Sequence, residues 1–193
     1  RIFLLKKLEK FTELFPDVKI KLTNHSTNQA VNALKAGLVD FAVVTTPVNL
    51  TNDMKSENLC SFNDILIAGP KYKQLCNKAL HLEELQEYPF ISLVEGTGTH
   101  DHYTKFFYDN DLHFNLDMEA STTDQVLAMV QSNLGLGFYP EQLASEYIMR
   151  GEIFPVSLHE SVPERDIILI RESRHAENIA AKKLINFLKH TTN

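Results

Sequence analysis

The sequence predicts an α/β protein made of two lobes. The main observation is a pattern that occurs twice: an apolar-alternating run, a polar turn, a helix-like segment, a glycine and then an apolar strand. The first copy reaches Gly37 and the strand 40–44, and the second reaches Gly135 and the strand 136–139. The second observation is that strand-like and helix-like segments alternate along the chain, which favours a mostly parallel sheet flanked by helices. A length of 193 residues allows one large or two small domains.

The elements of the first copy follow from periodicity. Leu4, Leu8, Phe11 and Phe15 recur at helical spacing, which predicts an amphipathic helix that stops at Pro16. A strand over 18–22, a polar turn, a helix over 29–36 and the strand 40–44 come next.

The later elements are predicted in the same way. Pro140 is expected to be the first residue of a helix, a position that tolerates proline. The predicted strands are 64–68, 88–94, 116–120, 136–139 and 166–170. The predicted helices are 82–85, one opening at 96–99, 124–133, one after Pro140, and one carrying Ala180, Leu184, Phe187 and Leu188.

The division into lobes follows from the strands 65–68 and 167–170, which flank a block of subdomain size. We expect 1–68 and 167–193 to form lobe I and 69–166 to form lobe II. The chain would cross twice between the lobes. A small molecule is expected in the cleft, near the carboxyl ends of the strands.

Composition and charge exclude several classes of protein. Apolar residues make up 44% of the chain and charged residues 23%, which is ordinary for a soluble globular protein, and the net charge is −6. No apolar run approaches the ~20 residues of a membrane helix, and the start of the chain is interrupted too early for a signal peptide. Cys60 and Cys76 form no pair or framework, which favours a reducing compartment. We therefore expect a cytoplasmic protein that does not itself bind nucleic acid or membranes.

Three segments in this order and spacing resemble a known family: Phe11 to Val18, Ala33 to Ala42, and Val126 to Pro140. Together they resemble the effector-binding domain of LysR-type transcriptional regulators, over essentially the whole chain. The resemblance implies a two-lobed periplasmic-binding-protein-like (type 2) fold, with two Rossmann-like subdomains joined by two crossover strands. It also implies a small-molecule inducer, a cytosolic homodimer that forms a higher oligomer in the full-length protein, and a DNA-binding winged helix-turn-helix that this chain lacks. The family's domain normally begins with a strand and a Ser/Thr-containing loop, whereas this chain starts at the first helix.

Polar turns at predicted strand ends are the candidate binding residues. Several lead into helices, whose free N–H groups and dipole favour an anion such as a carboxylate or oxyanion. The competing interpretation is that each Ser or Thr is only an N-cap. The candidate effector-binding residues are Ser26, Thr27, Thr45, Thr46, Gly96, Thr97, Gly98, Thr99, His100, Ser121, Thr122 and Phe138. We expect Ser26 and Thr27 to face the turn from Gly96 to His100 across the cleft.

Signatures of an enzyme or a cofactor are poor. Gly96-Thr97-Gly98 fails the dinucleotide fingerprint because position 101 is Asp101, and no Lys-Ser/Thr pair follows for a phosphate loop. His100 and His102 resemble metal ligands, but residues two apart on a helix point in different directions. We expect no catalytic residues, metal or cofactor. A free solute-binding protein and an enzyme on the same fold remain the alternatives.

The first helix also predicts dimerisation. Apolar residues surround it almost completely, which is more than one buried stripe requires. These residues are Ile2, Phe3, Leu4, Leu5, Leu8, Phe11 and Leu14. By the resemblance, this helix packs against a partner's helix, here the one that carries Tyr103, Phe106, Phe107 and Tyr108.

Overall fold

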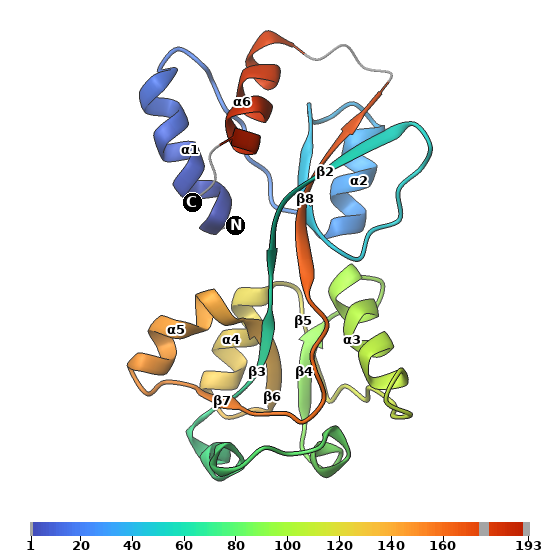
Figure 1. Cartoon of the computed structure of the whole chain (residues 1–193), viewed down its shortest axis with the longest axis vertical. Coiled ribbons are helices and arrows are strands. Elements are labelled where there is room, and N and C mark those ends of the chain that lie inside the picture. The colour runs from blue at the N-terminus through green and yellow to red at the C-terminus, as the bar shows by residue number, and fades with distance from the viewer. Residues whose placement is uncertain (1, 174–177, 191–193) are drawn as a thin grey trace. The chain divides into compact units, whose positions relative to one another are not determined.

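The computed structural model describes residues 2–173 and 178–190, and the side chains of Ile2 and Phe3 lie outside the described part (Figure 1). The chain folds into two compact units. Unit 1 holds the chain up to Val44, Asn49–Leu59, and the chain from Ile168 onward. Unit 2 holds Thr45–Val48 and Cys60–Ile167.

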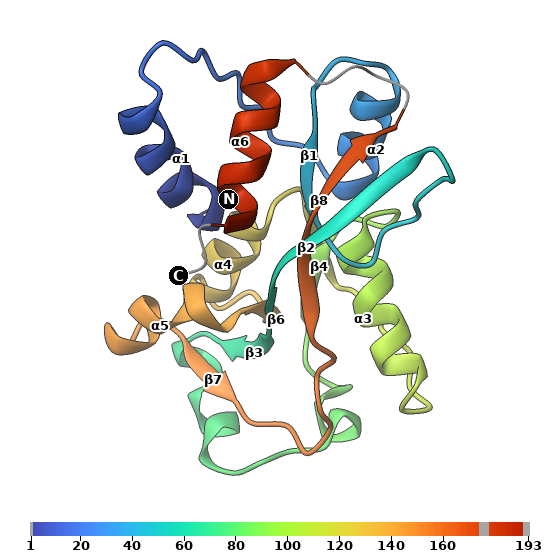
Figure 2. The same cartoon turned by 45° about the horizontal axis from the view of Figure 1, so that its top comes forward.

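Unit 1 is built on a three-stranded sheet in the order β1-β8-β2. Its strands are β1 (Ala42–Thr45), β2 (Met54–Phe62) and β8 (Arg165–Glu172), and its helices are α1 (Ile2–Leu14), α2 (Thr27–Lys35) and α6 (Ile179–His190). Helices α1 and α6 lie side by side (Figure 1 and Figure 2). Phe11 of α1 is fully buried there, with its ring 5.4 Å from that of Phe187. The core of unit 1 therefore joins the first and last helices to the sheet through Leu169.

Unit 2 is built on a five-stranded sheet in the order β5-β4-β6-β3-β7. Its strands are β3 (Asp64–Ala68), β4 (Phe90–Leu93), β5 (Met118–Ala120), β6 (Leu136–Pro140) and β7 (Phe154–Val156). The remaining elements are two 3₁₀ helices, η1 (Pro70–Asn77) and η2 (Leu82–Leu85), and the α-helices α3 (Gly98–Tyr108), α4 (Thr123–Gln131) and α5 (Glu141–Met149).

Side chains alternate between the two faces of this sheet, because successive residues of a strand point in opposite directions. Leu66 of β3 enters a core with Phe106 and Phe107 of α3, whereas its neighbour Ile67 enters a core with Val126 and Val130 of α4. Figure 1 accordingly shows α3 and α4 on opposite sides of β4 and β6. The sheet is thus covered on both faces, and α3 is fixed by its aromatic side chains.

The sheet of unit 2 is mixed, which corrects the expectation of a mostly parallel sheet. Strand β4 pairs in parallel with β5 and β6, but β3 pairs antiparallel with both β6 and β7. The same pairing assigns β3 to unit 2, since Leu66 pairs with Phe138 and with Val156. Residues 45–48, 60–68 and 167 were expected in lobe I, and they belong to unit 2 instead.

Local predictions also differ from the structure at several other elements. Residues 18–22 form no strand, because a strand requires a hydrogen-bonded neighbour and no described segment pairs with them. Pro140 is the last residue of β6 and the N-cap of α5, so the helix begins at Glu141. Strands β2 and β7 and helix η1 were not expected, whereas β3 and η2 have the predicted bounds.

Candidate functional site

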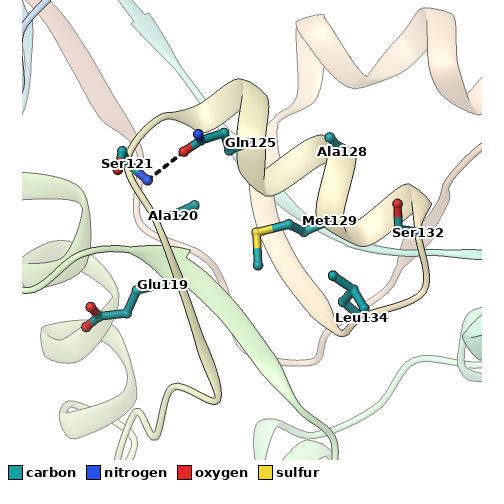
Figure 3. Close-up of a pocket in the computed structure, with 8 residues that line it drawn as sticks. All are labelled: Glu119, Ala120, Ser121, Gln125, Ala128, Met129, Ser132 and Leu134. Atoms are coloured by element: carbon teal, nitrogen blue, oxygen red, sulfur yellow. Dashed lines mark hydrogen bonds between the residues drawn. The ribbon is translucent and has the colours of Figure 1, made fainter.

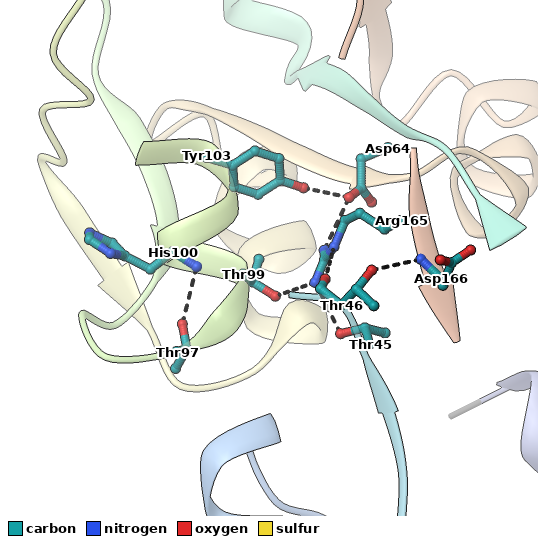
Figure 4. A network of polar contacts seen from close by, with 9 residues as sticks. All are labelled: Thr45, Thr46, Asp64, Thr97, Thr99, His100, Tyr103, Arg165 and Asp166. Atoms are coloured by element: carbon teal, nitrogen blue, oxygen red, sulfur yellow. Dashed lines mark hydrogen bonds and ion pairs between the residues drawn. The ribbon is translucent and has the colours of Figure 1, made fainter. Parts of the chain in front are cut away.

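The polar centre of unit 2 is the guanidinium group of Arg165, which is only 5% exposed (Figure 4). Its Nη1 donates to Asp64 Oδ2 at 3.1 Å, and its Nε donates to the carbonyl oxygen of Thr46 at 2.9 Å. Its Nη2 donates to Thr45 Oγ1 at 3.0 Å and to Thr99 Oγ1 at 2.9 Å. One side chain therefore gathers two of the predicted hydroxyls, which come from the end of β1 and from the start of α3.

Asp64 balances the charge of Arg165 at the start of β3. The carboxylate is 3% exposed, and its Oδ2 also accepts a 2.7 Å hydrogen bond from the hydroxyl of Tyr103. Burial, and then the neighbouring Asp64 charge, raise the pKa of Tyr103 well above its ordinary value, so the phenol keeps its proton and donates. Asp64 Oδ1 is buried and has no hydrogen-bond partner among the described residues. The buried pair of Arg165 and Asp64 is thus electrically neutral overall.

Thr46 attaches the short segment Thr45–Val48 to unit 2. Its N–H donates to the carbonyl of Asp166 at 2.9 Å, and its Oγ1 accepts from the N–H of Asp166 at 2.8 Å. Ser61 donates to Asp166 Oδ1 at 2.6 Å. Thr46 therefore has a structural role in addition to its predicted place in the site.

The start of α3 carries the other predicted residues. Thr97 is the N-cap, and its hydroxyl donates to the carbonyl of Val94 at 2.8 Å and accepts from the N–H of His100 at 3.3 Å. The N–H groups of Gly98 and Thr99 belong to the first turn, where intrahelical partners do not exist. Together with the helix dipole, they favour a negative charge beside Thr99.

Two histidines follow in the same helix. His100 Nδ1 lies 3.7 Å from Asp101 Oδ1, which is too far for a hydrogen bond. Burial, and then the charge of Arg165, lower the pKa of His102 to about 4. His102 is therefore neutral near pH 7. Residues 2–173 and 178–190 hold no group of three His, Cys, Asp or Glu side chains that could bind a metal ion.

The turn at Ser121 and Thr122 forms a separate feature (Figure 3). Gln125 accepts hydrogen bonds through Oε1 from the N–H groups of Ser121 at 2.8 Å and Thr122 at 3.2 Å, which completes a capping box. Beside it, between β5 and α4, is an open depression of about 450 Å³. It is lined by Glu119, Ala120, Ser121, Gln125, Ala128, Met129, Ser132 and Leu134. The N-cap interpretation thus accounts for the hydrogen bonds of Thr122.

The other candidates lie elsewhere. Ser26 and Thr27 lie at the start of α2 in unit 1, where Ser26 forms a capping box with Gln29, and their place opposite the turn from Gly96 to His100 stays a prediction. Gly96 has a φ of 79° and open space around it. Phe138 is 5% exposed and stacks on Tyr103 at 4.4 Å, so it belongs to the core and its burial does not favour contact with a ligand.

A comparison that covers the whole chain identifies its family. The model of the LysR substrate binding domain matches residues 1–193. The chain belongs to this family. The "HTH-type transcriptional regulator CysB" of Haemophilus influenzae is 29% identical over 138 residues, which cover 71% of this chain and 42% of that protein. The "HTH-type transcriptional activator CmpR" of Synechocystis is 26% identical over 137 residues, 70% of this chain and 44% of that protein. This LysR-type chain thus spans less than half the length of these two relatives.

Solved structures show the same fold at low identity. The regulatory domain of Synechocystis CcmR in complex with 2-PG has a TM-score of 0.85 at 13% identity, covering 97% of this chain and 90% of that one. The effector-binding domain of QuiR in complex with shikimate has a TM-score of 0.82 at 16% identity, covering 96% and 88%. The fold is therefore the periplasmic-binding-protein-like (type 2) fold that the resemblance implied.

Sequence reasoning missed the side chains that organise the candidate site. Asp64 is the single charged residue of β3, and Arg165 is the first residue of β8, separated from the apolar run 167–170 only by Asp166. A charged residue that is itself buried at the end of a strand requires a buried partner, so the charged residues beside these apolar runs were the signal that the sequence offered. The sequence did not indicate that Arg165 and Asp64 are each other's partners, because 101 positions separate them.

Proposed function

We propose that this chain senses an anionic metabolite and that Thr99 and the first turn of α3 hold the anion. The observation that carries the proposal is the position of Thr99, whose hydroxyl accepts from Arg165 while its N–H belongs to the first turn of a helix, where no intrahelical acceptor exists. Hydroxyl and N–H donors form stronger hydrogen bonds to charged than to neutral acceptors. The effector-binding domain of QuiR binds shikimate, which is a carboxylate, and a mutant regulatory domain of OxyR2 from Vibrio vulnificus is sulfate-bound.

The proposal extends to the whole protein. We infer that the chain is the regulatory part of a longer cytoplasmic DNA-binding protein, because its relatives are transcription regulators of more than twice the matched length. The effector would shift the populations of two conformations by its differential affinity for them. This role needs no catalytic residue. Within the described part of the chain, no helix is long and apolar enough to cross a membrane.

A homodimer is part of this proposal, but its predicted surface is corrected. Tyr103, Phe106 and Phe107 are at most 3% exposed within unit 2, so they cannot form a partner's binding face as expected, whereas Tyr108 is 73% exposed. On α1, Leu5 and Leu14 are 45% and 63% exposed. Sedimentation at micromolar concentration measures the oligomeric state of the chain. A monomer at all concentrations would contradict the proposed homodimer.

A binding experiment tests the anion site. Sulfate, succinate and shikimate are titrated into the chain by calorimetry, and thermal unfolding is followed in parallel. A ligand at ~100 times its dissociation constant adds about 2.7 kcal/mol to the free energy of unfolding, and each kcal/mol raises the melting temperature by ~2–4 °C for a protein of this size.

Variants of one helix locate the site. Thr99→Val removes the hydroxyl at nearly constant volume, and we expect it to weaken the best ligand about tenfold, as loss of one hydrogen bond to a charged group implies. Thr104→Val, at an exposed position of α3, is the matched control and should leave affinity unchanged. If Thr99→Val and Thr104→Val bind the ligand with equal affinity, the ligand does not contact the hydroxyl of Thr99.

A further inference from the structure

We propose that Arg165 positions the hydroxyl of Thr99 as a donor toward the anion, and that Asp64 sets the charge that the anion meets. This inference rests on the proposed function and assigns two residues to it that are not expected to touch the ligand. It requires three features: a fixed donor direction, a rigid guanidinium group and a compensated charge.

The direction of the Thr99 hydroxyl follows from hydrogen-bond chemistry. Arginine has five N–H donors and no acceptor, so a hydroxyl beside it can only accept. Thr99 Oγ1 accepts from Arg165 Nη2 at 2.9 Å, and its proton must therefore point away from the guanidinium group. A hydroxyl that accepts from a cation is also polarised as a donor, because hydrogen bonds in a chain strengthen one another. The hydroxyl of Thr99 can therefore donate its one proton only in the direction away from Arg165.

The guanidinium group is held rigidly. Four hydrogen bonds join it to Thr45, Thr46, Asp64 and Thr99, which come from three separate stretches of the chain. The ring of Phe62 lies 5.3 Å from its central carbon. The planar fork of arginine makes such contacts simultaneously, whereas lysine offers a single ammonium group. A donor held in this way requires little reorganisation when a ligand binds.

The charge of Arg165 is compensated before any ligand arrives. Asp64 accepts from it at 3.1 Å, and both side chains are at least 95% buried. The anion would therefore meet dipoles beside a neutral pair. Asp64→Asn keeps an oxygen acceptor for Tyr103 and Arg165 but removes the negative charge. The uncompensated positive charge of Arg165 would then attract an anion, more strongly than it would in water because the site is buried.

Sulfate titrations at pH 7.5 test this inference, with dimethyl sulfone as a neutral counterpart of similar shape. We expect Asp64→Asn to tighten sulfate binding about tenfold and Arg165→Gln to weaken it about tenfold. Binding of dimethyl sulfone should not change with charge. Asp109→Asn, at the opposite end of α3, changes the net charge equally and should leave sulfate affinity unaltered. Opposite effects of two variants in one ion pair are not expected from a purely structural role.

Arg165→Lys separates position from charge and is the second variant if Arg165→Gln does not fold. Lysine retains the charge but cannot bond Thr45, Thr99 and Asp64 in the same geometry, so sulfate binding should weaken several-fold. If wild type binds sulfate and Asp64→Asn fails to tighten it, or Arg165→Lys binds as wild type does, the inference is overturned and the proposed function stands. If wild type binds none of the anions, the proposed function fails and the inference fails with it.

Discussion

At the scale of single residues, the two glycines of the repeated pattern, Gly37 and Gly135, are not structurally equivalent. Gly37 has a φ of 67° and follows the C-cap of α2, where its N–H and that of Leu38 close the helix onto Leu34 and Ala33. In the second copy of the pattern that position belongs to Asn133, which has a φ of 62°. Gly135 comes two residues later, and a Cβ there would lie 2.5 Å from the carbonyl oxygen of Pro89. Gly37 thus provides a backbone conformation, and Gly135 provides space between strands.

Gly135→Ala should therefore destabilise unit 2. The added methyl group meets backbone that cannot move without disturbing β4 and β6, and overpacking of this kind costs about 1–3 kcal/mol. Gly151→Ala is the matched control, because its φ of 71° is strained for alanine but nothing lies within 4 Å of the new methyl group. That substitution should cost about 1–2 kcal/mol. Urea unfolding followed by circular dichroism compares the two, and a smaller loss for Gly135→Ala would contradict the steric argument.

His102 should make stability depend on pH. Its folded pKa of about 4 lies below the unfolded value near 6.5, so the unfolded state binds a proton first as pH falls. The contribution of neutral His102 to the free energy of unfolding is fully present above about pH 6.5 and is lost as the pH falls toward 4. We expect wild type to lose about 1–2 kcal/mol more between pH 7 and pH 5 than His102→Gln loses.

The control for this prediction is His113→Gln, since His113 is exposed in the loop before β5. It should retain the pH dependence of wild type. Unfolding by urea at a series of pH values measures the difference, and parallel curves for wild type and His102→Gln would show that another group is responsible.

At the scale of elements, α2 and α4 begin with the same capping box. The hydroxyls of Ser26 and Thr122 accept from the N–H groups of Gln29 and Gln125 at 3.4 Å and 3.3 Å. In each box the glutamine side chain accepts in turn from the backbone N–H of the N-cap residue. Two candidate binding turns are therefore explained by helix initiation. Their hydrogen bonds alone do not require a ligand.

Thr122→Ala should lower the free energy of unfolding by about 1 kcal/mol, which is typical of a lost N-cap. Ser145→Ala in the interior of α5 is the control, because Ser145 is exposed and alanine is the better helix former there. Its effect should be neutral or slightly stabilising. Chemical denaturation of both variants distinguishes the two cases, and equal effects would mean that the cap contributes nothing.

At the scale of the whole molecule, each unit has its own core. The core of unit 1 gathers Phe11, Leu169 and Leu184, and no residue of it belongs to the two clusters of unit 2. Phe11→Ala should cost about 3–5 kcal/mol locally. Separate cores allow separate unfolding. Hydrogen exchange should therefore accelerate in α1 and α6 while β6 and α4 keep their protection, and uniform acceleration through both units would show a single cooperative core.

The sequence by itself determined the class of fold, the family and most elements. Helix α1 was visible because Leu4, Leu8 and Phe11 recur at helical spacing, and β3 was visible as an apolar run ending at Gly69 and Pro70. These signals are local, since periodicity and turn residues act within one element. The candidate turns were found in the same way, including Thr45 and Thr99.

Only the tertiary structure decided how those elements pair and which side chains meet. The sheet is mixed because β3 runs antiparallel to both β6 and β7, whereas β4 pairs in parallel with β5 and β6. The segment 18–22 has strand-like alternation, but pairing is a property of two segments. Thr45, Asp64, Thr99 and Arg165 are separated by up to 120 positions, and they become neighbours only because a buried arginine requires a compensating charge and acceptors around it. That requirement acts through space, and no local pattern in the chain specifies which residues will satisfy it.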